Sequence, residues 1–134
     1  QVAHHLLLSH GLGLQALRAA GVRTPLGIVL NQSPAHPATD GEADRRAAEN
    51  AYNAFVRWFM DPLFLGRYPD EAGDRRPPQV EPGDMDCIRQ PLDFLGINYY
   101  TRMWCSTAVP PQPAPCALGV NDMGWEIYPE GLAV

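Results

Sequence analysis

Apolar residues recur at helical spacing over the first twenty positions of the chain. They form one stripe between Val2 and Ala20, and Gly21 follows as a residue that can end a helix in the left-handed conformation. The stripe consists of Leu6, Leu7, His10, Leu14 and Leu17. We therefore expect an amphipathic helix here, with this stripe facing the core.

Two later segments are apolar almost without interruption, which is typical of strands that are buried on both faces of a parallel sheet. The first runs from Gly27 to Asn31 and the second from Asp93 to Tyr100. Both runs are short and rich in β-branched or aromatic residues, which favours strands over helices. We expect the two strands to lie in one sheet.

A long helix is predicted between these strands. Thr39 or Asp40 can serve as its N-cap, and Asp61-Pro62 is expected to end it after about Met60. Its expected buried stripe is Ala47, Ala51, Phe55 and Trp58 or Phe59. The remaining expectations are an irregular, doubly proline-containing segment at 33–37, loops at 63–82 and 109–115, a short helix at 83–90, and a last helix after residue 126.

The predicted order is helix, strand, helix, strand, helix. Strands that alternate with helices pair in parallel through right-handed crossovers. Two strands alone do not make a stable parallel sheet, because each needs neighbours and covering helices. The pattern therefore predicts part of an α/β barrel or of an open α/β sheet, with the chain starting inside one helix and stopping as another begins.

Composition and charge narrow the possible functions. The net charge of −5 argues against a protein that binds nucleic acid, and no apolar run reaches the length of about 20 residues needed to span a membrane. The three cysteines form no CxxC pair, which favours a reducing, cytoplasmic setting. His4, His5 and His10 lack the spacing of a metal-binding helix, and no phosphate-binding loop or dinucleotide motif occurs, so we expect no metal and no cofactor.

Both predicted strands become polar at their C-terminal ends, where α/β folds carry their active sites. Asn31 ends the first, and Asn98 and Tyr100 end the second. Amide and phenol groups there can hydrogen-bond a polyhydroxylated ligand, although they could equally satisfy loop backbone or pack in the core. Trp125 lies in a loop beside a glycine and could stack on a sugar ring or anchor the core. Three glutamates are possible acid or base groups: Glu49, Glu126 and Glu130.

Five blocks of the sequence, taken in order, resemble glycoside hydrolase family 1, which includes bacterial β-glucosidases. Together they extend over almost the whole chain. They are residues 3–11 (AHHLLLSHG), 27–31 (GIVLN), 57–69 (RWFMDPLFLGRYP), 93–101 (DFLGINYYT) and 122–132 (DMGWEIYPEGL).

The resemblance implies a (β/α)8 barrel, of which residues 1–134 would be one partial domain, truncated at both ends. It would cover the helix after strand 4 through strand 6 and the start of the next helix. Family members are retaining β-glycosidases with an acid/base glutamate in Asn-Glu-Pro and a nucleophile in Glu-Asn-Gly. Neither motif occurs here, so the resemblance implies no catalytic residue in this chain and predicts that it is inactive alone.

The resemblance also implies supporting roles at four positions. Tyr100 matches the tyrosine that hydrogen-bonds the nucleophile, and Asn98 matches a residue that lines the same pocket. Trp125 matches an aromatic residue at the aglycone side, and Asn31 matches a site-facing residue of strand 5. The implied parent is a β-glucosidase that acts on small β-linked carbohydrates without cofactor or metal. The alternative is a non-catalytic sugar-binding or structural protein of the same fold.

Overall fold

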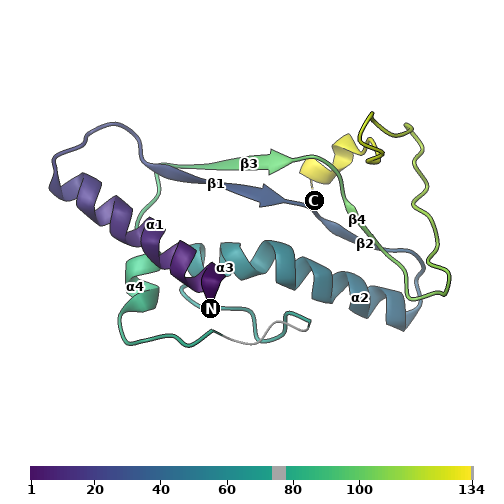
Figure 1. Ribbon diagram of the computed structural model, residues 1–134, viewed down its shortest axis with the longest axis horizontal. Coiled ribbons are helices and arrows are strands. Elements are labelled where there is room, and N and C mark those ends of the chain that lie inside the picture. Colours follow the sequence, from purple (N-terminus) through teal and green to yellow (C-terminus); the bar gives the residue numbers. More distant parts are fainter. Residues whose placement is uncertain (74–77, 134) are drawn as a thin grey trace.

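A computed structural model describes residues 1–73 and 78–133 and shows an α/β arrangement (Figure 1). The helical elements are α1 (Val2–Ala19), α2 (Glu42–Tyr52), the π-helical η1 (Asn53–Arg57), α3 (Trp58–Phe64), α4 (Asp84–Ile88) and the 3₁₀-helical η2 (Pro129–Leu132). The strands are β1 (Gly27–Gln32), β2 (Ala35–Pro37), β3 (Phe94–Tyr99) and β4 (Met103–Cys105). None of the helices in the described ranges has both the length and the apolar character to span a bilayer.

The strands form two small parallel sheets. β1 pairs with β3 over six residues from Gly27 opposite Phe94 to Gln32 opposite Tyr99, and β2 pairs with β4. The predicted parallel pairing of the two apolar runs is therefore confirmed. Across the described residues the two sheets do not close into a barrel.

The two sheets differ in register by one residue. Gln32 lies opposite Tyr99, and Ala35 lies opposite Met103. The chain therefore advances three residues from β1 to β2 and four residues from β3 to β4. One extra residue is therefore contained in the segment Tyr100–Arg102, as in a β-bulge. Bulges re-aim the side chains around them and are frequent next to active sites.

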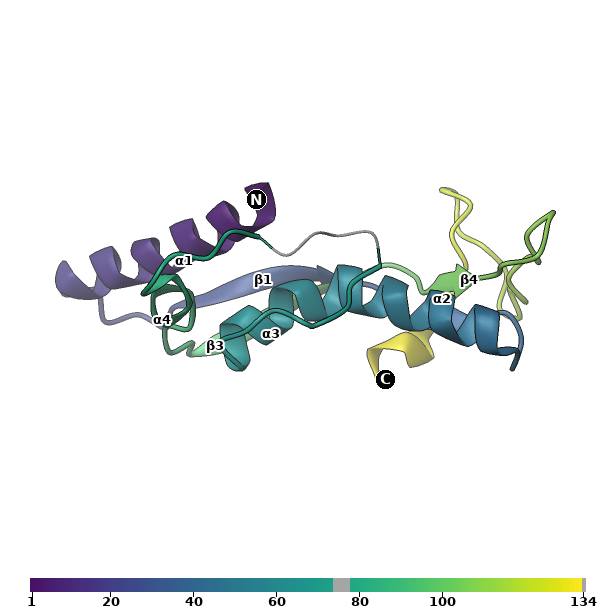
Figure 2. The ribbon, with the colours of Figure 1, turned by 90° about the horizontal axis from the view of Figure 1, so that it is seen from below.

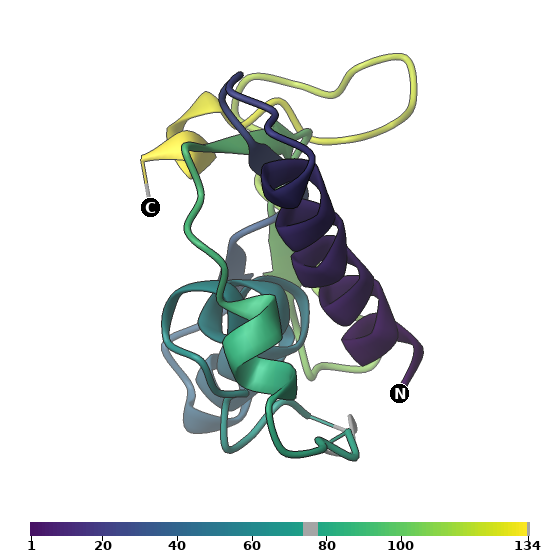
Figure 3. The ribbon, with the colours of Figure 1, turned by 90° about the vertical axis from the view of Figure 1, so that its left-hand side faces the viewer.

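The core lies on one face of the β1–β3 sheet. Figures 1 and 2 show α3 along this face and α2 continuing from it along β2 and β4, and Figure 3 shows α1 beside α4. The buried centre consists of Leu7, Leu30, Leu63 and Ile88, one from each of four elements. The expectation of strands buried on both faces is wrong for this chain, because no helix of the described residues covers the other face, where Val29 is 57% exposed.

Helix α1 ends as predicted. Gly21 has φ +78° and donates to the Arg18 carbonyl, while Val22 donates to the Leu17 carbonyl, which is a Schellman arrangement. The buried stripe differs from the predicted one, since Leu6 and Leu17 are exposed. The stripe that packs inward is His4, Leu7, Gly11 and Leu14.

The helix in the middle of the chain differs at both ends from its prediction. Gly41 is the N-cap, and Thr39 instead donates its hydroxyl to Asp44. The helix passes through Pro62 to Phe64, because the proline ring is fully buried and this burial offsets the lost backbone hydrogen bond. Of its predicted stripe Phe55 is exposed, whereas Trp58 is buried.

Two loop expectations are also corrected. The segment at 33–37 contains strand β2, which tolerates Pro37 because the donors facing β4 fall on the alternate residues: Ala38 donates to Cys105. The last helix is only the single 3₁₀ turn η2, whose first residue is Pro129. The short helix at 83–90 is present as α4, and the prolines at 109–115 lie in a loop, as predicted.

Candidate functional site

The two asparagines predicted from the sequence lie side by side. Asn31 and Asn98 are register partners at the C-terminal ends of β1 and β3. Both are exposed on the face opposite the helices, next to Val29 and Gly96. Among residues 1–73 and 78–133 neither side chain has a hydrogen-bond partner, so both amides are available to a ligand.

Tyr100 and Trp125 form a second pair at the same end of the sheet. Tyr100 directly follows β3, and its ring is 5.5 Å from that of Trp125, at an interplanar angle of 61°. Tyr100 is 55% exposed and Trp125 is 40% exposed. Since Tyr100 follows Asn98 by two residues, the structure gathers all four predicted positions at one edge of the sheet. An edge with free amides and exposed ring faces suits a sugar.

The backbone holds Trp125 in a tight turn. The Asn121 carboxamide oxygen accepts hydrogen bonds from the amides of Met123 and Trp125, each at 3.0 Å. The Asn121 amide donates to the Trp125 carbonyl at 2.9 Å. Gly124 completes the turn with φ +77°, a conformation that glycine adopts without strain.

Glu126 is not available as an acid or base. It is 7% exposed, and Arg102 donates to both of its carboxylate oxygens at 2.8 Å. The amide of Cys116 donates to the same carboxylate. Hydrogen bonding from Arg102 holds the pKa of Glu126 below its ordinary value, so the group stays ionised. Glu49 and Glu130 are exposed, on α2 and η2 respectively.

Sequence reasoning missed Arg102. Its guanidinium lies 3.8 Å from the centroid of the Tyr128 ring and 4.7 Å from that of Trp104, which adds cation–π contacts to the ion pair with Glu126. The available signal was a single arginine among apolar residues just after the second strand, and a single glutamate between Trp125 and Ile127. Opposite charges in two apolar settings are expected to find each other.

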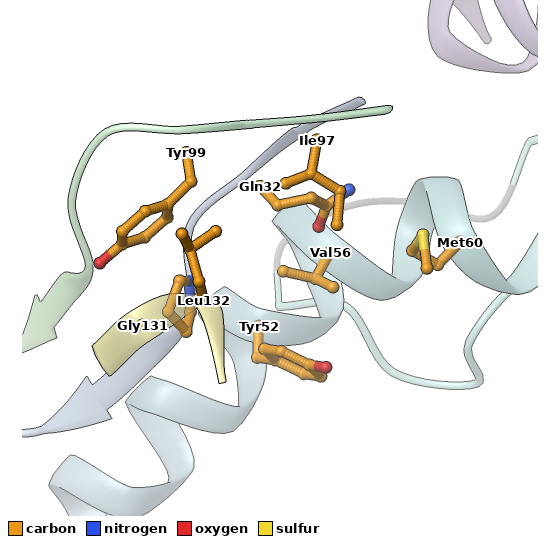
Figure 4. Close-up of a pocket in the computed structure, with 9 residues that line it drawn as sticks. Gln32, Tyr52, Val56, Met60, Ile97, Tyr99, Gly131 and Leu132 are labelled. Carbon is orange, nitrogen blue, oxygen red and sulfur yellow. The ribbon is translucent and has the colours of Figure 1, made fainter. Parts of the chain in front are cut away.

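A pocket lies on the other side of the sheet, between the strands and the helices (Figure 4). Apart from Gln32, Tyr52 and Tyr99, its lining is mostly apolar: Pro34, Val56, Met60, Ile97, Gly131 and Leu132. Gln32 is buried, and within the described part of the chain its carboxamide has no partner. None of the predicted site residues lines this pocket, and it lies on the face where α/β folds pack their helices.

The three histidines of α1 differ in their burial. His4 is fully buried, with Nδ1 2.8 Å from the Tyr68 hydroxyl and Nε2 3.0 Å from Asp84 Oδ2. His5 is exposed, and His10 is half-buried. Over the ranges that the structure describes, no three His, Cys, Asp or Glu side chains are placed to hold a metal ion.

Comparison with known proteins places these residues in a family. A profile of glycosyl hydrolase family 1 matches residues 1–133. The chain is 43% identical to a β-glucosidase of Agrobacterium sp. over 141 aligned residues, which cover 96% of this chain and 30% of that enzyme. It is 36% identical to β-glucosidase A of Acetivibrio thermocellus, covering 98% of this chain and 32% of that enzyme.

Solved structures agree. A β-glucosidase from Exiguobacterium marinum superposes with a TM-score of 0.83 at 35% identity, covering 96% of this chain and 32% of that one. The virulence factor SghA in complex with its substrate analogue salicin gives 0.83 at 37% identity, covering 97% of this chain and 31% of that one. These enzymes are (β/α)8 barrels, and the chain spans about a third of their length. The chain therefore belongs to glycosyl hydrolase family 1, and its α/β arrangement is part of that family's barrel.

Proposed function

We propose that this chain forms the central part of a retaining β-glucosidase, from the helix after strand 4 through strand 6 of the barrel. In this assignment β1 is strand 5 and β3 is strand 6. The observation that carries the proposal is the gathering of Asn31, Asn98, Tyr100 and Trp125 at the C-terminal edge of two parallel strands, in a chain that matches family 1 over residues 1–133.

The bond-breaking groups of such an enzyme are two glutamates outside this chain. One protonates the glycosidic oxygen while the other attacks the anomeric carbon; the first then activates water to hydrolyse the glycosyl-enzyme. Tyr100 donates a hydrogen bond from its phenol to the nucleophile and so stabilises the carboxylate. Asn31 and Asn98 hydrogen-bond sugar hydroxyls, and Trp125 stacks on the aglycone.

The proposed substrates are β-glucosides. The names of the relatives support a glucosyl group, and the salicin complex of SghA supports an aromatic aglycone. The exposed rings of Tyr100 and Trp125 offer apolar surface for such an aglycone. We also propose a reducing, cytoplasmic setting, which the three free thiols of Cys87, Cys105 and Cys116 support.

A segment exchange tests the proposal. The stretch of the Agrobacterium β-glucosidase that aligns with residues 1–134 is replaced by this chain, and the chimera is assayed with salicin. We expect the chimera to hydrolyse salicin and the isolated chain to show no turnover, because both glutamates come from the host enzyme. A folded but inactive chimera would contradict the proposal, and so would turnover by the isolated chain.

Within the chimera, Tyr100→Phe tests the site itself. The substitution removes one proton donor from the nucleophile and keeps the ring beside Trp125. We expect kcat to fall by about tenfold or more. Tyr52→Phe, which removes a phenol from the helix-facing pocket, is the matched control and should leave kcat unchanged. Equal rates for the two variants would remove Tyr100 from the mechanism.

A further inference from the structure

Three consecutive residues after β3 each contact the segment that carries Trp125. The ring of Tyr100 lies against that of Trp125, and the Thr101 hydroxyl donates to the Glu126 carbonyl at 3.0 Å. Arg102 completes the set through both carboxylate oxygens of Glu126. The exposed aromatic pair and the buried ion pair thus join the same two segments, the one after β3 and the one that carries Trp125. Trp125 and Glu126, their members in the latter segment, are adjacent in sequence.

The ion pair is the buried part of this connection. The side chains of Arg102 and Glu126 are 9% and 6% exposed, whereas Tyr100 and Trp125 are about half exposed. The guanidinium also lies over the rings of Tyr128 and Trp104, so ring contacts hold it in addition to the ion pair. A planar fork that binds two oxygens and stacks on rings is specific to arginine, and a lysine ammonium cannot reproduce it.

Trp125 has few other constraints on its position. The segment from Thr107 to Gly124 is exposed over most of its length and contains no helix or strand apart from an isolated antiparallel bridge between its Val120 and Glu126. Trp125 stands at the end of this segment, and the tight turn at Asn121 constrains it only locally. The fixed point nearest to Trp125 is therefore the adjacent Glu126, anchored by Arg102 to the end of β3.

We propose that Arg102 is a positioning residue for aglycone recognition, which holds Trp125 against Tyr100 by fixing Glu126. The inference rests on the proposed function, since it concerns the same edge of the sheet. Arg102 touches no reacting atom in this role. It sets where the stacking surface lies and so determines how well a bulky aglycone is held.

The mechanism supplies a readout that a general loss of structure would not give. The aglycone is present in the first step of a retaining hydrolysis and absent from the second. In the chimera, Arg102→Met should lower kcat/KM for salicin by roughly tenfold, the loss expected for one displaced aromatic contact. It should change kcat/KM for β-glucosyl fluoride, whose leaving group is a single atom, by less than about twofold. Arg102→Lys should behave like Arg102→Met.

Arg46→Met is the matched control, because Arg46 pairs with Glu42 on the exposed surface of α2. It should leave both substrates unaffected. Equal losses for salicin and glucosyl fluoride in Arg102→Met, or no loss for salicin, would overturn the inference. A chimera that is inactive before any substitution would instead count against the proposed function.

Tryptophan fluorescence tests the role of Arg102 without an activity assay, so its failure is distinguished from failure of the proposed function. In the full chain with Trp58→Phe and Trp104→Phe, Trp125 is the only tryptophan. Adding Arg102→Met should shift its emission to the red and increase its quenching by acrylamide, while Arg46→Met should change neither. Unchanged emission and quenching after Arg102→Met would show that Arg102 does not position Trp125.

Discussion

At the scale of single residues, His4 shows how one buried side chain joins three segments. It lies at the start of α1 and bonds to Tyr68 in the loop after α3 and to Asp84 at the start of α4. Hydrogen bonds from the Glu81 amide and from His4 hold the pKa of Asp84 below its ordinary value. An ionised carboxylate only accepts hydrogen bonds, so His4 Nε2 is the donor to Asp84.

Replacing His4 should therefore weaken the fold. We expect His4→Ala to lower the free energy of unfolding by about 1–3 kcal/mol, because it removes a buried imidazole together with its hydrogen bonds to half-buried Tyr68 and Asp84. His5→Ala is the matched control on the exposed side of the same turn, and it should change stability by less than about 0.5 kcal/mol. Urea unfolding followed by circular dichroism measures both. Similar values for the two variants would contradict the role of His4.

Tyr68 gives the same network a dependence on alkaline pH. Burial raises the pKa of Tyr68 to about 12, whereas an unfolded tyrosine ionises near 10. Tyr68 therefore loses its phenol proton at lower pH in the unfolded chain than in the folded one. Its contribution to stability is complete below pH 10 and declines as the pH rises from 10 to about 12. Stability of the full chain should fall over this range, and Tyr68→Phe should reduce the fall. A fall of the same size in Tyr68→Phe would assign it to another group.

Residue roles were only partly predictable from the sequence. Asn31 and Asn98 could be assigned to a strand end because each follows an apolar run. The state of Glu126 could not, since it depends on Arg102, which is 24 residues away in the chain. The sequence around a glutamate does not show which residue pairs with it, and that pairing determines whether the carboxylate can act as a base.

At the scale of elements, the contact between α1 and α4 depends on a glycine. Gly11 lies against the backbone of Cys87 in α4, and a Cβ atom at position 11 would overlap the Cys87 carbonyl. Gly13 lies two residues further along the same helix, and a Cβ atom built there would have nothing within 4 Å. Close helix packing therefore requires glycine at position 11 but not at position 13.

Alanine substitution should separate them. Gly11→Ala should destabilise the chain by about 1–3 kcal/mol, because the helices must move apart. Gly13→Ala should stabilise it by about 0.5–1 kcal/mol through higher helix propensity. Thermal unfolding of the two variants gives the comparison. If both substitutions stabilised the chain, that result would contradict the close approach of α1 to α4 at Gly11.

The elements themselves were predictable where a local pattern specifies them. The runs that became β1 and β3 and the helix ended by Gly21 depend on neighbours in sequence. Strands β2 and β4 are three residues long and exist through pairing between Ala35 and Met103, which no local pattern records. The passage of the helix through Pro62 likewise depends on tertiary burial that overrides the local penalty.

At the scale of the whole molecule, ionised carboxylates connect distant segments. Asp44 of α2 accepts from the amide and hydroxyl of Thr107 and from the hydroxyl of Thr39, and these bonds hold its pKa below the ordinary value. Asp84 and Glu126 have lowered pKa values for similar reasons. The three groups lie in different parts of the structure.

These shifts predict acid lability. Each carboxyl binds a proton more readily in the unfolded chain, so its contribution is complete above the ordinary carboxyl pKa and is lost as the pH falls through the lower folded value. Stability should therefore decline as the pH drops below about 4. Thr107→Val, which removes one donor to Asp44, should make the decline shallower, whereas Ser9→Ala on exposed α1 should not. Equal slopes would contradict the contribution of Asp44.

The complete architecture could not be built from the predicted elements alone. Two parallel strands with helices on one face are compatible with either a barrel or an open sheet. The five matching blocks removed that ambiguity, because they identify a family rather than a local pattern.

In the proposed role of Arg102, the extra residue between Tyr99 and Met103 makes the length of this segment a determinant of aglycone recognition. Side chains alternate between the two faces of a strand, so losing one residue there would turn Arg102 away from the side on which it meets Glu126. A deletion of one position would then release Trp125 even if every other residue were retained. Among relatives, insertions and deletions at this point should accompany changes in aglycone choice more closely than substitutions do.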